Sequence, residues 1–109
     1  MPLKPINYKE RLLKQSPQKL YLLAHKHKKR LKFAESKIAT VPNWAFLYII
    51  DFIKHPWPDA EPYIINDPHW AYMYARHILK KRWPEAEPLI KNRDLRKWAD
   101  YKKYFKFDD

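Results

Sequence analysis

The stretch Trp83–Ile90 reads WPEAEPLI, and the earlier stretch Trp57–Ile64 reads WPDAEPYI, which gives a 26-residue period. An eight-residue segment that recurs this closely marks a repeating structural unit. Two further segments align at the same spacing: Pro42–Tyr48 (PNWAFLY) matches Pro68–Tyr74 (PHWAYMY), and Ala34–Ile38 matches Ala60–Ile64. A last, partial copy aligns Trp98–Tyr101 with Trp70–Met73 after a two-residue insertion. The sequence therefore predicts a helical repeat region over residues 34–109.

Proline and acidic residues predict where the helices of each unit begin. Asp59 and Glu85 are predicted as N-caps of a short helix that has Pro62 or Pro88 in its first turn. Asp67-Pro68 then predicts a longer helix that ends near residue 82, and the equivalent helix runs from about residue 42 to 55. The last helix is predicted over residues 94–106.

Residues 1–33 form a separate basic region of the sequence. A short helix is predicted over residues 7–15, and Ser16-Pro17 is typical of an N-cap followed by the first helical residue. The next helix is expected to run to about residue 33, because apolar side chains recur at helical spacing. We predict that this region packs on the repeats as one domain. The fold class is all-α, a small domain of stacked short helix pairs, since a chain without glycine disfavours hairpins.

The sequence WPEAEP, together with the pattern DPxWAYxYA, resembles a tandem short helical repeat found in uncharacterised proteins of large bacteriophages. The similar region covers roughly residues 30–106, and the 34–56 copy departs from it at Ser36, Val41 and Pro56. The resemblance implies a viral origin and a helical repeat. It implies no activity.

The five tryptophans have two interpretations. Trp44, Trp70 and Trp98 occupy a recurring position, where they could stack on nucleobases or fill the seam between units. Recurrence beside alanine and tyrosine favours the seam, so they are predicted as repeat core. Trp57 and Trp83, each before a proline, are predicted to staple helices together.

Catalysis is not expected from this sequence. The carboxylates Asp59/Glu61 and Glu85/Glu87 are two residues apart, a spacing that does not place them on one helix face. The five histidines lack the spacing of a zinc site, and no cysteine or glycine is present to build a thiolate site or a phosphate loop. We therefore expect no enzymatic activity, no metal, no cofactor and no small-molecule substrate.

Positive charge is concentrated near the N-terminus. The net charge is +11, and residues 1–40 hold eleven of the 23 Lys and Arg residues but only two of the twelve acids. Nucleic-acid phosphates would offset the repulsion within this cluster, and an acidic protein surface or a solvated face are the alternatives. The leading hypothesis is non-specific binding of DNA or RNA. The predicted phosphate contacts are Lys19, Lys26, Lys28, Lys29, Arg30 and Lys32.

A protein-interaction role is the second hypothesis, either a factor that docks on a host protein or a small virion component. Its predicted interface anchors are the tyrosines of the repeat surface, Tyr63, Tyr72, Tyr74 and Tyr101. The longest apolar run, residues 44–50, is too short for a membrane span. A cytoplasmic location is expected, in the host cell if the protein is viral, and the oligomeric state stays open.

Overall fold

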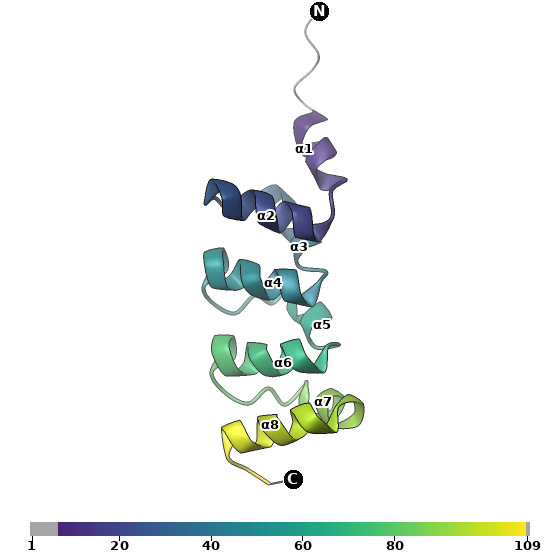
Figure 1. The fold of residues 1–109 in the computed structure, drawn as a ribbon, viewed down its shortest axis with the longest axis vertical. Coiled ribbons are helices and arrows are strands. Elements are labelled where there is room, and N and C mark those ends of the chain that lie inside the picture. The colour runs from purple at the N-terminus through teal and green to yellow at the C-terminus, as the bar shows by residue number, and fades with distance from the viewer. Residues whose placement is uncertain (1–6, 109) are drawn as a thin grey trace, which may run out of the picture.

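Four long helices form successive layers of a column (Figure 1). The computed structural model describes residues 7–108, and all regular elements among them are helical. The layers are α2 (Pro17–His27), α4 (Pro42–Tyr48), α6 (Pro68–Tyr74) and α8 (Leu95–Phe105). All four run in the same direction, with their C-terminal ends at the left edge of Figure 1. The predicted all-α class is confirmed.

Four further α-helices among residues 7–108 lie outside the layers: α1 (Asn7–Leu13) precedes the first layer, and the other three lie where the chain returns to the start of the next layer. These three are α3 (Glu35–Ile38), α5 (Glu61–Ile64) and α7 (Glu87–Arg93). A 3₁₀ turn, η1 (Lys32–Ala34), precedes α3. Buried side chains from α2 to α8 join in one apolar cluster, so the basic N-terminal region packs against the layers that follow.

The predicted helix starts are partly confirmed. Ser16 Oγ accepts from Lys19 N at 3.2 Å, and Asp67 Oδ1 accepts from His69 N at 3.1 Å. The N-cap prediction for Asp59 and Glu85 is wrong. The backbone N–H of Ala60 donates to the carbonyl of Trp57, as does that of Ala86 to Trp83, so a tight turn forms first.

The helices therefore start later than predicted at these two places. Ala60 and Ala86 are the N-caps of α5 and α7, and neither helix has a side-chain cap. Pro62 and Pro88 still fall in the first turn, as predicted, where a missing N–H has no intrahelical partner to lose.

The long helices end at lysines in the left-handed conformation. Helix α2 stops at His27 rather than near residue 33, because Lys28 has φ 52° and ψ 43°. The same conformation recurs at Lys54, Lys80 and Lys106, with φ of 62°, 57° and 62°. In the two middle layers a π-helical turn precedes the lysine, η2 (Ile49–Ile53) and η3 (Ala75–Leu79). The helices predicted to reach residues 55 and 82 therefore end at 53 and 79.

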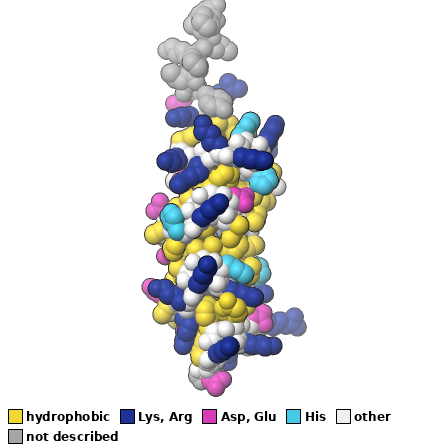
Figure 2. Space-filling view, turned by 90° about the vertical axis from the view of Figure 1, so that its left-hand side faces the viewer, with side chains coloured by type: hydrophobic (Ala, Val, Ile, Leu, Met, Phe, Trp, Pro, Cys, Tyr) yellow, Lys and Arg dark blue, Asp and Glu magenta, His cyan; other side chains and the backbone are white. Residues whose placement is uncertain are grey.

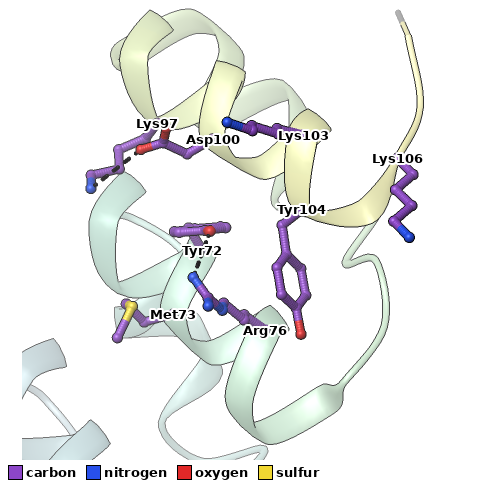
Figure 3. A pocket seen from close by; sticks show the side chains of 8 residues that line it. All are labelled: Tyr72, Met73, Arg76, Lys97, Asp100, Lys103, Tyr104 and Lys106. Atoms are coloured by element: carbon purple, nitrogen blue, oxygen red, sulfur yellow. Dashed lines mark hydrogen bonds and ion pairs between the residues drawn. The ribbon is translucent and has the colours of Figure 1, made fainter.

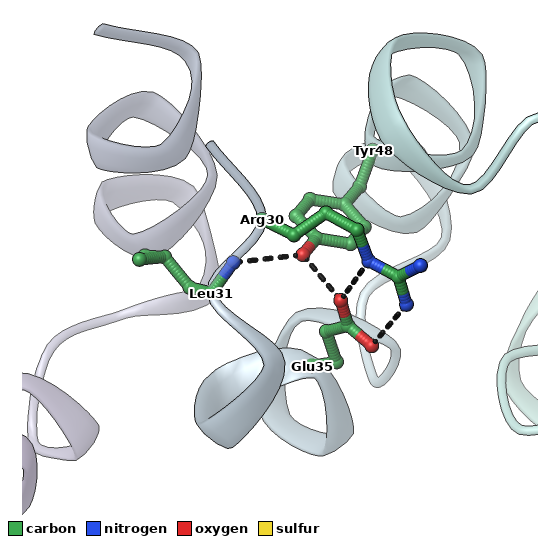
Figure 4. Close-up of polar contacts among 4 residues, drawn as sticks. All are labelled: Arg30, Leu31, Glu35 and Tyr48. Atoms are coloured by element: carbon green, nitrogen blue, oxygen red, sulfur yellow. Dashed lines mark hydrogen bonds and ion pairs between the residues drawn. The ribbon is translucent and has the colours of Figure 1, made fainter. Parts of the chain in front are cut away.

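Each of three layers is tied to the preceding turn by one tyrosine hydroxyl. The Tyr48 hydroxyl donates to Glu35 at 2.6 Å and accepts from the backbone N–H of Leu31 at 3.1 Å (Figure 4). Tyr74 donates to Glu61 at 2.6 Å and accepts from Trp57 N at 2.8 Å. Tyr101 repeats the arrangement with Glu87 and Trp83 N, both at 2.7 Å. We call these three groups the tyrosine–glutamate links.

Arginine completes the first and third links but not the second. Arg30 holds Glu35 with two hydrogen bonds of 2.8 and 2.9 Å. Arg82 holds Glu87 with two of 2.8 Å. Pro56 occupies the corresponding position, one period after Arg30 and one before Arg82, so Glu61 has no arginine there.

The third link also corrects the alignment of the last layer. The Tyr101 hydroxyl makes the contacts that Tyr74 makes one layer earlier, so Tyr101 is equivalent to Tyr74 and not to Met73. The insertion is therefore one residue, and it lies where α7 is longer than α5. Helix α8 lacks the π turn of the middle layers, so the interval from Tyr101 to Lys106 is one residue shorter than that from Tyr74 to Lys80. Lys106 therefore returns to the 26-residue spacing.

Acidification should weaken the third link. The hydrogen bonds from Arg82 lower the pKa of the Glu87 carboxyl, burial raises it, and the Tyr101 hydroxyl lowers it, with a net decrease. A carboxyl whose pKa is lower in the folded than in the unfolded state stabilises the fold above its unfolded pKa of about 4.3. That stabilisation is lost as the pH falls through the folded pKa.

We expect thermal melts of wild type and Glu87→Gln to show this directly. The wild type should be the more stable at pH 6, and the difference in melting temperature should shrink as the pH is lowered from about 4.3. A difference that stays constant between pH 6 and pH 3 would contradict the assignment.

Candidate nucleic-acid interface

A row of lysines follows the C-terminal ends of the four long helices. We call Lys28, Lys54, Lys80 and Lys106 the C-cap ridge, since each is the C-cap of its layer. All four are exposed, and none forms an ion pair within the part of the chain that the structure describes. With helices packed about 9 Å apart, the ridge extends over about 27 Å.

Figure 2 views this edge of the column directly. Lysine, arginine and histidine side chains follow its whole length, and acidic side chains are fewer. Between the two middle layers lies a hollow of about 310 Å³ that Lys54, His55, His77 and Lys80 line together with apolar residues. No carboxylate lines it. Burial and then the charge of Arg76 lower the pKa of His77, which disfavours a positive charge on this ring.

The backbone conformation of the ridge lysines carries a cost. A residue with a Cβ in the left-handed region is disfavoured by roughly 1–2 kcal/mol, and helices most often place glycine there. A lysine also interacts favourably with the negative end of the helix dipole, by about 0.3–1 kcal/mol. However, a lysine one residue earlier would obtain the same dipole interaction without the strained backbone. The dipole alone therefore does not account for lysine at all four positions.

The predicted phosphate contacts lie in two places rather than on one helix. Lys26 is in the last turn of α2, Lys28 caps it, and Lys29 and Arg30 follow. Lys32 begins the 3₁₀ turn η1. Lys19 is in the first turn of α2, at the far end from the ridge.

Arg30 differs from the other five predicted contacts because Glu35 already neutralises its charge. Its guanidinium is paired with Glu35 in the first tyrosine–glutamate link, and Arg82 is paired with Glu87 in the same way. The carboxylate of Asp51 has partners of its own, since it accepts hydrogen bonds from Tyr21 at 2.6 Å and His25 at 3.3 Å. The lysines of the ridge, like Lys26 and Lys29 beside Lys28, form no ion pair among the described residues.

Three ridge lysines were missed as site residues because they lie within the nearly neutral part of the sequence. Lys54, Lys80 and Lys106 belong to a region whose net charge is only +2, so local charge density does not reveal them. The spacing of the lysines could have identified them, because the four follow one another at the 26-residue period of the repeat.

The tryptophans divide into two groups by burial. Trp57, Trp83 and Trp98 are buried. Trp44 and Trp70 are half-buried and bridge neighbouring layers, with ring contacts to Tyr21 at 5.7 Å and to Phe46 at 5.2 Å. Four of the five therefore contribute to packing between layers, whereas the ring contacts of Trp98 are to Tyr101 and Phe107.

Most of the tyrosines that were predicted as interface anchors are too buried to contact a partner protein. Tyr72, Tyr74 and Tyr101 are buried, and Tyr63 alone of the four is exposed. The prediction failed because the hydroxyls of Tyr74 and Tyr101 turn inward to glutamate and backbone groups. An interface built on these four side chains is excluded.

No family model, no curated protein and no solved structure matches this chain. Among residues 7–108 no three metal-ligating side chains are grouped closely enough to hold an ion. The described helices also include none with the length and hydropathy needed to cross a membrane.

Proposed function

We propose that this protein is a non-enzymatic binding module that contacts nucleic-acid phosphates through the C-cap ridge and the lysines that follow α2. The observation that carries the proposal is the recurrence of lysine at four strained positions along one edge. Backbone strain that persists at every equivalent position is a reason to look for a ligand there. A row of exposed ammonium groups is the chemistry that a polyphosphate recognises.

The layered fold explains how scattered residues form a continuous surface. Each unit contributes one C-cap lysine, and because the layers are parallel these lysines lie at one edge of the column. Lys26 and Lys29 flank Lys28 at the end of α2 and extend the same edge, and Lys32 follows in the 3₁₀ turn η1. Contacts to phosphates carry no base information, so we expect weak sequence preference.

Binding isotherms at several salt concentrations test the proposal. A protein that neutralises six phosphates of duplex DNA gives a slope of log affinity against log salt of about −5. The double variant Lys54→Gly/Lys80→Gly removes two ridge charges while supplying the residue that a left-handed C-cap prefers. We expect the slope to decrease by about 2 in magnitude, with thermal stability unchanged or improved.

A charge-matched control uses the opposite ends of the layers. Lys19→Gln/Arg96→Gln removes two cations from the first turns of α2 and α8, and we expect it to keep the wild-type slope. Equal losses in both double variants would show that net charge, not the ridge, governs binding. No binding to DNA or RNA at low salt, combined with nuclease-resistant capture of an acidic protein, would reject the proposed function.

A further inference from the structure

An open hollow of about 670 Å³ lies between the end of α6 and helix α8 (Figure 3). Tyr72, Met73 and Arg76 line it from one layer. Lys97, Asp100, Lys103, Tyr104 and Lys106 line it from the next. Its volume is within the range of sites that hold small organic groups. Because Lys106 also belongs to the C-cap ridge, the hollow continues that ridge at its C-terminal end.

The lining of the hollow is strongly cationic. Arg76, Lys97, Lys103 and Lys106 face a single carboxylate, Asp100, which Lys97 already approaches at 3.8 Å. Three positive charges therefore remain in excess at pH 7. An anionic group is the ligand that this lining favours.

The hollow also contains a preformed flat surface. The Arg76 guanidinium lies 4.4 Å from the centre of the Tyr104 ring, and its Nη1 donates to the Tyr72 hydroxyl at 3.0 Å. The hydrogen bond and the cation–π contact hold the guanidinium between two tyrosines, as Figure 3 shows. Tyr104 is 44% exposed, whereas Tyr72 beside it is buried. An arginine plane and an exposed aromatic ring are both surfaces on which nucleobases stack.

We propose that this hollow is a nucleotide subsite that holds an unpaired base, so that the preferred ligand is single-stranded nucleic acid. The base stacks on the exposed ring of Tyr104, which Arg76 holds in place, and the adjoining phosphates contact Lys103 and Lys106. A base within a duplex has both faces covered by its neighbours and cannot make this contact. The inference rests on the proposed function, since it names the kind of nucleic acid that the ridge would bind.

An acidic peptide is the other ligand that a cationic hollow could take. A peptide carboxylate would use the lysines and Arg76 but would gain little from the ring of Tyr104. Dependence of affinity on the aromatic ring therefore separates the two ligands.

The experiment measures fluorescence anisotropy of a labelled 12-nucleotide mixed-sequence DNA strand and of the duplex that it forms with its complement. We expect the single strand to bind the full-length protein more tightly than the duplex at equal salt. Tyr104→Ala should weaken single-strand binding about 10-fold or more, because stacking of one base is lost. Tyr104→Trp should keep the affinity, and duplex binding should be unchanged in both variants.

Tyr63→Ala is the matched control, since Tyr63 is 43% exposed and lies on α5 outside the hollow. It should leave both affinities unchanged. Arg76→Gln serves as a second variant, and it should weaken single-strand binding without changing the far-ultraviolet circular dichroism spectrum. A helical spectrum for Tyr104→Ala shows that any loss of binding is not a loss of fold.

The outcomes separate the two proposals. Equal affinity for both forms, with no effect of Tyr104→Ala, overturns the subsite and leaves the ridge proposal standing. Tighter binding of a polyglutamate peptide than of the single strand also overturns the subsite. Absence of binding to either DNA form at low salt overturns both proposals together.

Discussion

Replacing Trp83 with alanine should lower the free energy of unfolding by about 3–5 kcal/mol. The Trp83 side chain is only 6% exposed, and its ring packs at 5.1 Å from that of Tyr74 in the layer above. Its backbone N–H donates to the Tyr101 hydroxyl of the layer below. Truncation therefore leaves a cavity at the point where two layers and the chain between them meet. Urea unfolding, followed by circular dichroism, measures the change as a lower midpoint at constant slope.

Trp70→Ala provides the comparison within the same protein. Trp70 is half-buried, and its ring lies 5.2 Å from that of Phe46, so part of the space that it vacates is open to water. We expect a loss of about 1–2 kcal/mol for this variant. Equal losses for Trp70→Ala and Trp83→Ala would show that the two tryptophans contribute alike to the seam. That result would contradict the expectation that the buried tryptophans stabilise the fold more than the half-buried ones.

The period of the sequence predicted the stacking of the layers because every unit repeats the same apolar positions. Ala34, Ala60 and Ala86 are all fully buried and follow one another at the repeat period, as do Ile38, Ile64 and Ile90. N-caps at Ser16 and Asp67 were also predictable, since a polar residue before proline is a local signal.

The C-terminal ends of the helices were not predictable from the same rules. Those rules look for glycine after the last helical residue, and this chain contains none. Lysine takes that place, so α2 appeared to continue through Lys28. The π turns before Lys54 and Lys80 were likewise hidden, because one additional residue in a turn leaves no mark on the apolar pattern.

The candidate site was predicted in part. Charge density identified the cluster around Lys28, but the cluster lies at and after the end of α2 and not along the whole face of a helix. Its continuation through Lys54, Lys80 and Lys106 depends on the parallel layers, which bring distant residues to one edge. The role of Glu61 and Glu87 was missed for the same reason, since the tyrosines that bind them come from the following layer.

Replacing Tyr74 with phenylalanine should cost about 2–3 kcal/mol, although only one oxygen atom is removed. That oxygen accepts from the buried backbone N–H of Trp57 and donates to Glu61. Both partners stay in place without it. A buried polar group that loses its hydrogen-bond partner still has its full desolvation penalty, which nothing then offsets. Burial and the hydrogen bond to Glu61 raise the pKa of Tyr74 well above its usual value, so the hydroxyl remains a donor at neutral pH.

Tyr101→Phe is the matched variant, because the third link contains an arginine that the second lacks. After this substitution Glu87 keeps both hydrogen bonds from Arg82, so only the Trp83 N–H loses its partner. We therefore expect a smaller loss for Tyr101→Phe than for Tyr74→Phe, measured by urea unfolding at pH 7. The double variant Tyr101→Phe/Arg82→Gln should then approach the loss of Tyr74→Phe. An equal loss of stability for Tyr101→Phe and Tyr74→Phe would contradict this explanation. It would show that the unpaired glutamate does not account for the greater sensitivity of the second link.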